Sequence, residues 1–313
     1  MSRILITGGA GFIGSYLVEA LISLGYEVVV LDNFSSGSLD NLSRVLNCGL
    51  LKVVKGDIRD PETVSKSLEE CKVVFHFAAN PEVRLGVPKE HYEHNLRGTF
   101  TILEEMRKKD VRDIVFASSS TVYGDAEVLP TPEDYAPLKP ISVYGASKLG
   151  CEALISSYVY TYGFRGIALR YANVVGPRSR RGVIYDFIKK LRANPRELEI
   201  LGDGTQTKSY IWIDDAVEAT LTAWNHMRNG FDALNIGSVD AISVKEIADI
   251  VVEVLGLQNV KYRFTGGIEG RGWPGDVKYM HLDISKIQRL GWTPRYTSGE
   301  AVRMTAEKLA SSL

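Results

Sequence analysis

The chain has 313 residues, 45% of them hydrophobic, so it can bury a large core and form two lobes. Its 37 Lys and Arg against 38 Asp and Glu give a net charge of −1, which offers no electrostatic case for binding nucleic acid or a membrane surface. Its three cysteines (Cys48, Cys71, Cys151) have neither zinc nor disulfide spacing, no apolar run reaches the ~20 residues of a membrane span, and we expect a cytoplasmic protein without a signal peptide.

The first predicted strand leads into a glycine-rich turn and a helix. Residues 3–14 read RILITGGAGFIG, in which the apolar run 4–6 is typical of a strand buried on both faces. Gly8, Gly11 and Gly14 then allow a tight turn, the close approach of a pyrophosphate, and close packing of helix on strand. Free N–H groups at the helix N-terminus favour a bound phosphate. Taken alone, this spacing also fits an ordinary strand–helix turn.

The next elements favour a dinucleotide site. The helix predicted over 12–24 ends at Gly25. One of its faces is apolar, with Ile13, Leu17, Leu21 and Leu24. A second strand, 27–31, leads to Asp32, whose carboxylate can bind both hydroxyls of an adenosine ribose. The same charge disfavours a 2′-phosphate and no Arg follows directly, so we expect NAD rather than NADP.

Strands and helices continue to alternate along the chain. Strands are predicted over 51–55, 73–77, 114–117 and 166–171. The helix predicted over 91–109 places four apolar residues on one side, Leu96, Phe100, Leu103 and Met106. This alternation predicts an α/β fold, a Rossmann doubly wound parallel sheet with helices on both faces. We place this domain at 1–172 and a smaller α/β domain at 173–313, with segments near 205–235 returning to the first.

Hydroxyl side chains follow the fifth predicted strand, at 118–121. The carboxyl end of a strand is where doubly wound sheets bind ligands, although such a run can also cap a helix. Beyond a proline-rich loop, Tyr144 and Lys148 begin a helix that extends to about 162. This spacing puts both on one helix face, where the ammonium can lower the phenol pKa below its usual ~10 and create a general base. A surface pair with the Tyr half in the core is the alternative.

The second half of the chain carries fewer chemical signals. Its further predicted elements include helices over 183–191, 283–290 and 301–309 and strands over 198–201 and 234–237. We interpret Asp214 and Asp215 as helix-capping residues rather than a metal site. Ser243 and Glu246 form a predicted capping box for a helix that ends at Gly256. We assign no metal site.

An ordered series of short motifs runs through the chain. They are TGGAGFIG at 7–14, LDN at 31–33, GD at 56–57, FHFAA at 75–79, NLRGT at 95–99, SSSTVYG at 118–124, YGASK at 144–148, RYANVVGPR at 170–178 and GDGTQTKSYIWIDD at 202–215. With these motifs the chain resembles the extended short-chain dehydrogenase/reductase family over nearly its whole length. Within that family it is similar to the NAD-dependent nucleoside-diphosphate-sugar epimerases, in particular those that interconvert UDP-glucose and UDP-galactose.

The resemblance implies which residues bind NAD. The pyrophosphate would contact Gly8, Gly11, Phe12, Ile13 and Gly14. The adenosine would be surrounded by Asp32, Asn33, Ser35, Ser36 and Gly37 at its ribose and by Asp57 and Ile58 at its base. The rest of the cofactor channel would comprise Phe77, Ala78, Ala79, Asn95, Ser118, Tyr144, Lys148 and Tyr171.

The resemblance also implies the chemistry. Tyr144 would be the base, Lys148 its electrostatic partner and a ribose ligand, and Ser119 the hydrogen-bond partner of the reacting sugar oxygen. Tyr144 would take the proton of the sugar 4-hydroxyl while C4 gives hydride to NAD. The 4-keto sugar would then turn over, and hydride and proton would return with the other face presented. The nucleotide half of the substrate would be bound by Asn173, Val183, Lys208, Tyr210 and Arg271.

Some positions depart from the family pattern. Lys208 stands where the family usually has Arg, which replaces a bidentate phosphate contact with a point charge. Arg271 stands further from Asp276 than in the bacterial pattern. Met280 falls near the position that gates sugar size, and a flexible methionine does not decide whether N-acetylated sugars fit.

Other activities are alternatives. A UDP-N-acetylglucosamine 4-epimerase, a 4,6-dehydratase or a UDP-glucuronate decarboxylase would share most of these motifs. Ser120 and Thr121 replace the Asp-Glu pair of the dehydratases, and Ser119 replaces the usual Glu of the decarboxylases. The alternative of another class is a catalytically silent NAD sensor or scaffold, although the chain keeps both Tyr144 and Lys148.

The resemblance further implies the partners of the chain. The substrate would be a UDP-hexose, with no nucleic-acid or membrane partner. Two copies of the chain would form a homodimer through a four-helix bundle built from the helices near 92–109 and 145–162.

Overall fold

The computed structural model describes residues 2–84 and 86–312 and divides into two compact units. The first unit comprises Met1–Val122, Val143–Arg170 and Thr220–Leu234. The second unit comprises Tyr123–Ser142, Tyr171–Ala219 and Asn235–Leu313. The segment 123–142, which we had expected in the first domain, therefore groups with the second unit.

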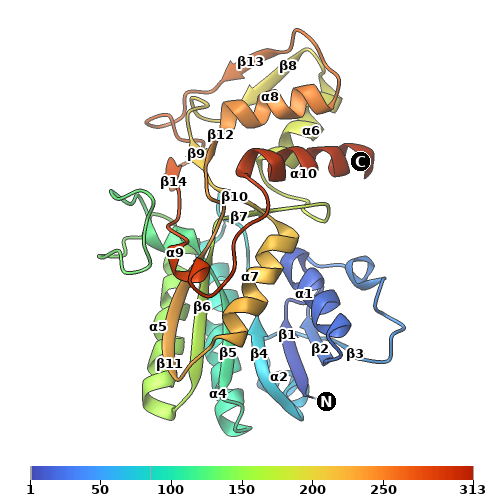
Figure 1. Ribbon diagram of the computed structural model, residues 1–313, viewed down its shortest axis with the longest axis vertical. Helices are drawn as coiled ribbons and strands as arrows, with labels where there is room; N and C mark the ends of the chain where they lie inside the picture. Colours follow the sequence, from blue (N-terminus) through green and yellow to red (C-terminus); the bar gives the residue numbers. More distant parts are fainter. Residues whose placement is uncertain (1, 85, 313) are drawn as a thin grey trace. The chain divides into compact units, whose positions relative to one another are not determined.

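A seven-stranded sheet is the centre of the first unit (Figure 1). Its strand order is β11-β6-β5-β4-β1-β2-β3. The strands are β1 (Arg3–Thr7), β2 (Glu27–Asp32), β3 (Leu51–Lys55), β4 (Cys71–His76), β5 (Asp113–Ser119), β6 (Arg165–Tyr171) and β11 (Gly230–Ile236). The order reverses between β1 and β4, which pair in parallel, and this is the point where doubly wound sheets bind ligands. The predicted Rossmann doubly wound sheet is confirmed.

Helices cover both faces of this sheet. They are α1 (Phe12–Ser23), α2 (Pro61–Ser67), α3 (Pro88–Glu90), α4 (Gly98–Lys108), α5 (Val143–Tyr162) and the end of α7 (Ile213–Asn225). A π-helical segment (His91–Arg97) precedes α4, and 3₁₀ turns lie at Leu39–Leu42 and Ser120–Tyr123. Because strand side chains alternate, Leu5 faces one layer of helices, whereas Phe75 packs edge-on against Trp224 of α7 on the other side.

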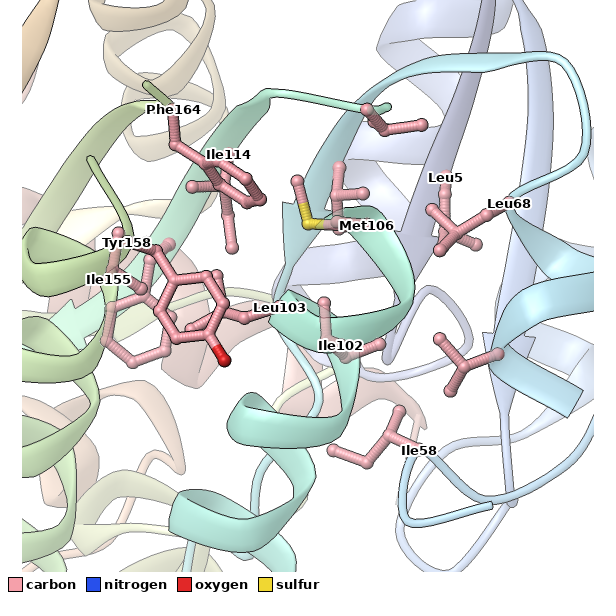
Figure 2. Close-up of a cluster of buried hydrophobic side chains, with 14 of the residues drawn as sticks. Leu5, Ile58, Leu68, Ile102, Leu103, Met106, Ile114, Ile155, Tyr158 and Phe164 are labelled. Atoms are coloured by element: carbon pink, nitrogen blue, oxygen red, sulfur yellow. The ribbon is translucent and has the colours of Figure 1, made fainter. Parts of the chain in front are cut away.

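The main core of the first unit lies between the sheet and α2, α4 and α5. Figure 2 shows Leu5 of β1, Ile102, Leu103 and Met106 of α4, and Tyr158 of α5 in this one cluster. Two members of the predicted apolar stripes are exposed, since Leu24 is 61% exposed and Phe100 is 48% exposed. Leu24 follows the last residue of α1, and Phe100 is on the outer side of α4, so those two assignments were wrong.

Three small sheets and four helices make up the second unit. β7 (Asn173–Val175) pairs with β10 (Tyr210–Trp212), β8 (Glu197–Ile200) pairs with β13 (Lys261–Phe264), and β9 (Thr207–Lys208) pairs with β12 (Ile242–Ser243) and β14 (Tyr279–Met280). The helices are α6 (Val183–Ala193), α8 (Val244–Val254), α9 (Ser285–Gln288) and α10 (Ser298–Ser312).

Two local predictions in the second unit have different outcomes. The capping box of Ser243 and Glu246 is confirmed at the start of α8. Asp214 and Asp215 do not precede α7 but lie inside its first turn, where Asp214 accepts a hydrogen bond from the Trp212 indole and Asp215 is buried against Arg295. Among residues 2–84 and 86–312, no helix is both long and apolar enough to span a bilayer.

Candidate active site

The glycine-rich turn passes close to neighbouring backbone. Gly8 has φ +71°, and its N–H donates to the carbonyl of Leu31 at 2.8 Å. A Cβ on Gly8 would lie 2.7 Å from the Ala78 nitrogen, and one on Gly14 would lie 2.3 Å from the Gly8 oxygen. Other predicted pyrophosphate ligands begin α1 beside it, namely Gly11, Phe12 and Ile13. At this edge of the sheet the turn is therefore lined by main-chain atoms and not by side chains.

Asp32, the last residue of β2, is tied to this turn. Its carboxylate accepts hydrogen bonds from Ala10 N–H at 2.9 Å and from Phe34 N–H at 2.8 Å, and the residue is 8% exposed. A Cβ on Gly37 would lie 2.8 Å from the backbone of Ala10, so the loop containing Asn33, Ser35 and Ser36 returns to the turn. The role of Asp32 at an adenosine ribose stays a prediction.

Asp57 and Ile58 follow β3 at the same edge of the sheet. The Arg59 guanidinium donates to both carboxylate oxygens of Asp57, at 2.9 and 2.7 Å. This charge-assisted pair lowers the pKa of Asp57 to about 2, and a hydrogen bond from Asn33 adds to the effect. Asp57 is thus a fixed anion, and its pairing with Arg59 was not predicted.

The residues after β4 connect the turn to α5. Ala78, between Phe77 and Ala79, donates its N–H to the Thr7 hydroxyl at 3.2 Å. Asn95 accepts the Asn80 N–H at 2.7 Å and donates to the Ser147 hydroxyl at 2.9 Å. The Ser147 hydroxyl in turn donates to the Tyr144 carbonyl at 2.7 Å. Asn95 is 2% exposed, so this network is shielded from solvent. Its hydrogen bonds hold the first turn of α5 in place.

The Ser119 hydroxyl lies beside the Tyr144 phenol and acts to lower its pKa. The oxygen of Ser119 also accepts from the Thr121 hydroxyl at 2.9 Å and from the Thr121 N–H at 3.2 Å. Thr121 therefore anchors the Ser119 side chain. The structure places Ser119 near Tyr144, as the sequence predicted.

Lys148 lies one helical turn after Tyr144 and is 3% exposed. Its Nζ donates to the Ala117 carbonyl at 2.8 Å and lies 4.9 Å from the Phe116 ring centroid and 5.8 Å from the Tyr144 ring centroid. Burial lowers the pKa of this amine to about 8, while nearby Glu152 opposes the change. The lysine is a buried cation near pH 7, and its charge lies near the Tyr144 phenol.

The expected lowering of the Tyr144 pKa was wrong for the protein by itself. Desolvation raises the pKa of the phenol to about 12, and the hydrogen bond from Ser119 offsets only part of this. Lys148 points to a carbonyl of β5 rather than to the phenol oxygen, so its charge does not dominate. The phenol is consequently protonated near neutral pH and needs further positive charge to become a base.

Ser118, the remaining member of the predicted set in β5, is used inside the unit. Its hydroxyl donates to Glu152 at 2.5 Å, and the same carboxylate forms a buried ion pair with Arg170 at 2.8 Å. Glu152 and Arg170 are 3% and 5% exposed. These contacts hold β5, β6 and α5 together. The Ser118 hydroxyl is already bound to Glu152, and its contact with a cofactor stays a prediction.

Two cations of the second unit lie against carboxylates. Lys208 in β9 donates to Asp276 at 2.5 Å and lies 5.4 Å from the Trp273 ring centroid. Arg271 donates to both carboxylate oxygens of Asp125, each at 2.9 Å, and to the Asp276 carbonyl at 2.6 Å. Asp276 therefore links the two basic residues that were predicted to bind a nucleotide diphosphate.

The other predicted substrate residues occupy separate elements. Asn173 in β7 donates its side-chain amide to the Ser209 carbonyl at 3.1 Å, and Val183 begins α6. Tyr210 in β10 is 6% exposed, and desolvation raises the pKa of its phenol. Tyr171 is buried at the end of β6. Their roles toward a ligand stay predictions.

Sequence reasoning missed the supporting residues, which include Arg59, Thr121, Glu152, Arg170 and Asp125. Glu152 alone had a usable signal, because it follows Lys148 by one helical turn. The pairings of Arg59 and Asp125 depend on loop conformation, for which the sequence has no periodic pattern. Within the part of the chain that the structure describes, no group of three or more His, Cys, Asp or Glu could hold a metal ion.

Comparison with known proteins agrees with this arrangement. The model of the NAD dependent epimerase/dehydratase family matches residues 4–237. A UDP-glucose 4-epimerase of Bacillus subtilis (strain 168) is 35% identical over 316 residues, 92% of this chain and 91% of the relative. A crystal structure of a UDP-galactose 4-epimerase is 51% identical with a TM-score of 0.89 and covers 99% of both chains. The UDP-glucose 4-epimerase of Thermotoga maritima, solved with UDP-glucose, is 33% identical with a TM-score of 0.87 over 99% of both chains.

Proposed function

The chain belongs to the NAD-dependent epimerase/dehydratase family, and from that premise we propose that it interconverts UDP-glucose and UDP-galactose. The observation that carries this proposal is the placement of Ser119 and Lys148 beside the Tyr144 phenol, with Lys148 one helical turn away. These are the groups that a reversible oxidation of an alcohol requires, namely a proton acceptor, a hydrogen-bond donor and a fixed cation.

The first unit fits the cofactor of this family. A Cβ at Gly8 or Gly14 would collide with neighbouring backbone, so the turn at the end of β1 can bring its main chain close to a pyrophosphate. Asp32 and Asp57 place carboxylates after β2 and β3, where an adenosine would lie. Bound NAD supplies the acceptor and donor of hydride in this chemistry.

We assign the proton transfers to the chain's own residues. Tyr144 removes the proton of the sugar 4-hydroxyl and later returns it, while Ser119 donates a hydrogen bond to the same sugar oxygen. The positive charge of a nicotinamide ring bound beside the phenol would lower the pKa of Tyr144 from its raised value, and Lys148 is a fixed cation one helical turn away. Because both the hydride and the proton taken from the sugar are returned to it, the reaction has no net redox change.

The second unit supplies candidate ligands for the UDP group. Lys208 and Arg271 are the cations proposed to bind the diphosphate, with Asn173, Val183 and Tyr210 as further contacts of the nucleotide. Binding energy from this non-reacting half can retain the substrate while the oxidised sugar turns over. This arrangement favours strong contacts to the nucleotide and weak ones to the sugar.

Product analysis tests the proposed activity. Purified protein is incubated with UDP-galactose without added cofactor and again with NAD, and the nucleotide sugars are separated by chromatography. UDP-glucose is the expected product. A 4-keto-6-deoxy sugar would indicate a dehydratase, and no turnover even with NAD would favour a silent NAD-binding protein. Conversion of UDP-N-acetylglucosamine in the same panel decides whether N-acetylated sugars are also substrates.

We also propose a cytoplasmic homodimer. Three cysteines without disulfide partners suit a reducing compartment. For the dimer, the support is a set of exposed aromatic side chains on and near α4 and α5, with Tyr92 at 56%, Phe100 at 48% and Tyr160 at 77% exposure. Apolar residues on these two helices would be covered in a four-helix bundle.

A further inference from the structure

The guanidinium of Arg271 is held on one side only. Asp125 occupies the fork between its two terminal nitrogens, with Nη1–Oδ1 and Nη2–Oδ2 distances of 2.9 Å. The Asp276 carbonyl accepts a further hydrogen bond from Nη1 at 2.6 Å. The Arg271 side chain is 19% exposed, so these partners set its plane in a largely enclosed position.

The opposite edge of Arg271 has no such partner. Of the five N–H donors of a guanidinium, three are used by Asp125 and Asp276, which leaves Nε–H and the outer N–H of Nη2. Throughout the described residues, these two donors make no hydrogen bond that meets ordinary geometry; the Glu269 carboxylate lies 3.7 Å from Nε and is 78% exposed. Two parallel N–H groups on one edge match two oxygens of a phosphate.

We propose that Asp125 is a positioning residue, which holds the end fork of Arg271 so that its Nε/Nη2 edge is presented to the diphosphate of the substrate. This inference rests on the proposed function, in which Arg271 binds that diphosphate. Asp125 does not touch the reacting sugar in this scheme. It acts through Arg271 on the affinity for the nucleotide.

Charge alone predicts the opposite effect. Lys208 and Arg271 are balanced by Asp125 and Asp276, so the cluster has no net positive charge with which to attract a diphosphate. Removing the Asp125 charge makes the cluster more positive and would strengthen anion binding if Coulomb attraction dominated. If orientation dominates, a released Arg271 loses its fixed plane and binds the anion less well. The sign of the change therefore distinguishes the two effects.

The test compares Asp125→Asn with Glu269→Gln. Each variant removes one carboxylate charge near Arg271, but only Asp125 is hydrogen-bonded to it. We expect Asp125→Asn to weaken UDP binding and raise KM for UDP-galactose by about five- to tenfold, with kcat within about twofold of the parent. Glu269→Gln should bind UDP as well as the parent or better. Uridine, which has no phosphates, should bind Asp125→Asn and the parent equally.

A double-variant cycle separates this inference from the function on which it rests. Asp125→Asn should have no further effect on UDP affinity in an Arg271→Ala background, because the residue through which it acts is gone. Unchanged or tighter UDP binding by Asp125→Asn, or an equal loss of uridine binding, would overturn the positioning role. Asp125→Ser serves as a second variant if the Asp125→Asn protein unfolds at a lower temperature than the parent. If Arg271→Ala leaves UDP affinity unchanged, the inference fails while conversion of UDP-galactose by the parent still stands.

Discussion

Two protons decide the reactivity of the first unit, one on Tyr144 and one on Lys148. Burial acts on both, but it favours the neutral form in each case, which raises the phenol pKa to about 12 and lowers the amine pKa to about 8. Near pH 7 the resting pair is therefore a neutral phenol beside a cationic lysine. A base must be produced by additional positive charge, so activity depends on the complete site.

Replacing Tyr144 with Phe removes the proton acceptor and little else. We expect kcat for UDP-galactose to fall by about 10³-fold, within the range for loss of a general base, because Ser119 cannot substitute for a phenol. Affinity for UDP, measured by calorimetric titration, should be unchanged, since the proposed contact of Tyr144 is with the sugar 4-hydroxyl and not with the nucleotide. A variant that kept more than about a tenth of the parent kcat would contradict the assigned role.

The pH dependence of kcat should report the ionisation of Lys148. Its pKa of about 8 means that the ammonium is present below this pH and is lost as the pH rises through it. Because the charge supports the Tyr144 phenolate, kcat should decline above about pH 8. The measurement is kcat for UDP-galactose from about pH 6 to 10, with UDP affinity determined at each pH as the control. A kcat that stays level or rises to the alkaline end would exclude this role.

Residue roles were predictable where a motif fixed both residue type and spacing. Ser119, Tyr144 and Lys148 could be chosen because their motifs resemble those of the family, at a predicted strand end and on one predicted helix face. The partner of Asp215 could not, since Arg295 is 80 positions away and the pair forms only when the second unit folds. The pKa of Tyr144 was misjudged for a similar reason: the sequence places the lysine nearby but not the direction of its Nζ.

At the scale of elements, the glycine turn is limited by backbone rather than by side chains. A methyl group at Gly14 would lie 2.3 Å from the Gly8 oxygen and 2.9 Å from the Gly9 Cα. Main-chain atoms in a packed turn cannot move aside as a flexible side chain could. The strand–turn–helix unit therefore has to open before a larger residue fits.

Gly14→Ala should consequently lose both stability and cofactor. We expect destabilisation of about 1–3 kcal/mol from overpacking, together with loss of NAD that co-purifies with or is added to the parent. Thermal unfolding and the absorbance of released nucleotide measure the two effects. Gly299→Ala is the matched control, because its nearest neighbour would be 3.8 Å away and helix α10 tolerates alanine. Full retention of NAD by Gly14→Ala would contradict the steric argument.

The first unit was more predictable than the second at this scale. Most of its strands are buried runs separated by amphipathic helices, which is a strong periodic signal. In the second unit, the capping box at Ser243 could be predicted because its signal is local. The strands β9, β12 and β14 have two residues each and are held by partners far along the chain, so no periodicity could indicate them. Segment 123–142 grouped with the second unit because Thr131 pairs with the backbone around 281–283, a contact without local signal.

At the scale of the whole molecule, the exposed aromatic residues near α4 and α5 allow a test of assembly. We expect the protein to sediment as a dimer and Tyr160→Asp to sediment as a monomer, because a buried unpaired carboxylate is costly in an apolar interface. Leu24→Asp is the control, since Leu24 is similarly exposed, at 61%, but lies beyond α1. Analytical ultracentrifugation at low micromolar concentration measures the mass. A monomeric parent would refute the dimer.

The first unit is assembled from three stretches of chain, and the last of them spans Thr220–Leu234. Its seventh strand, β11, borders β6, so until residues 230–236 leave the ribosome the nascent sheet ends in an unpaired β6. A ribosome that stalls before this point would hold a partly built sheet whose edge strand has unpaired backbone N–H and C=O groups and can associate with other chains. Chaperones that bind extended segments should therefore engage the growing polypeptide throughout the synthesis of 171–229, and release it once the closing strand arrives.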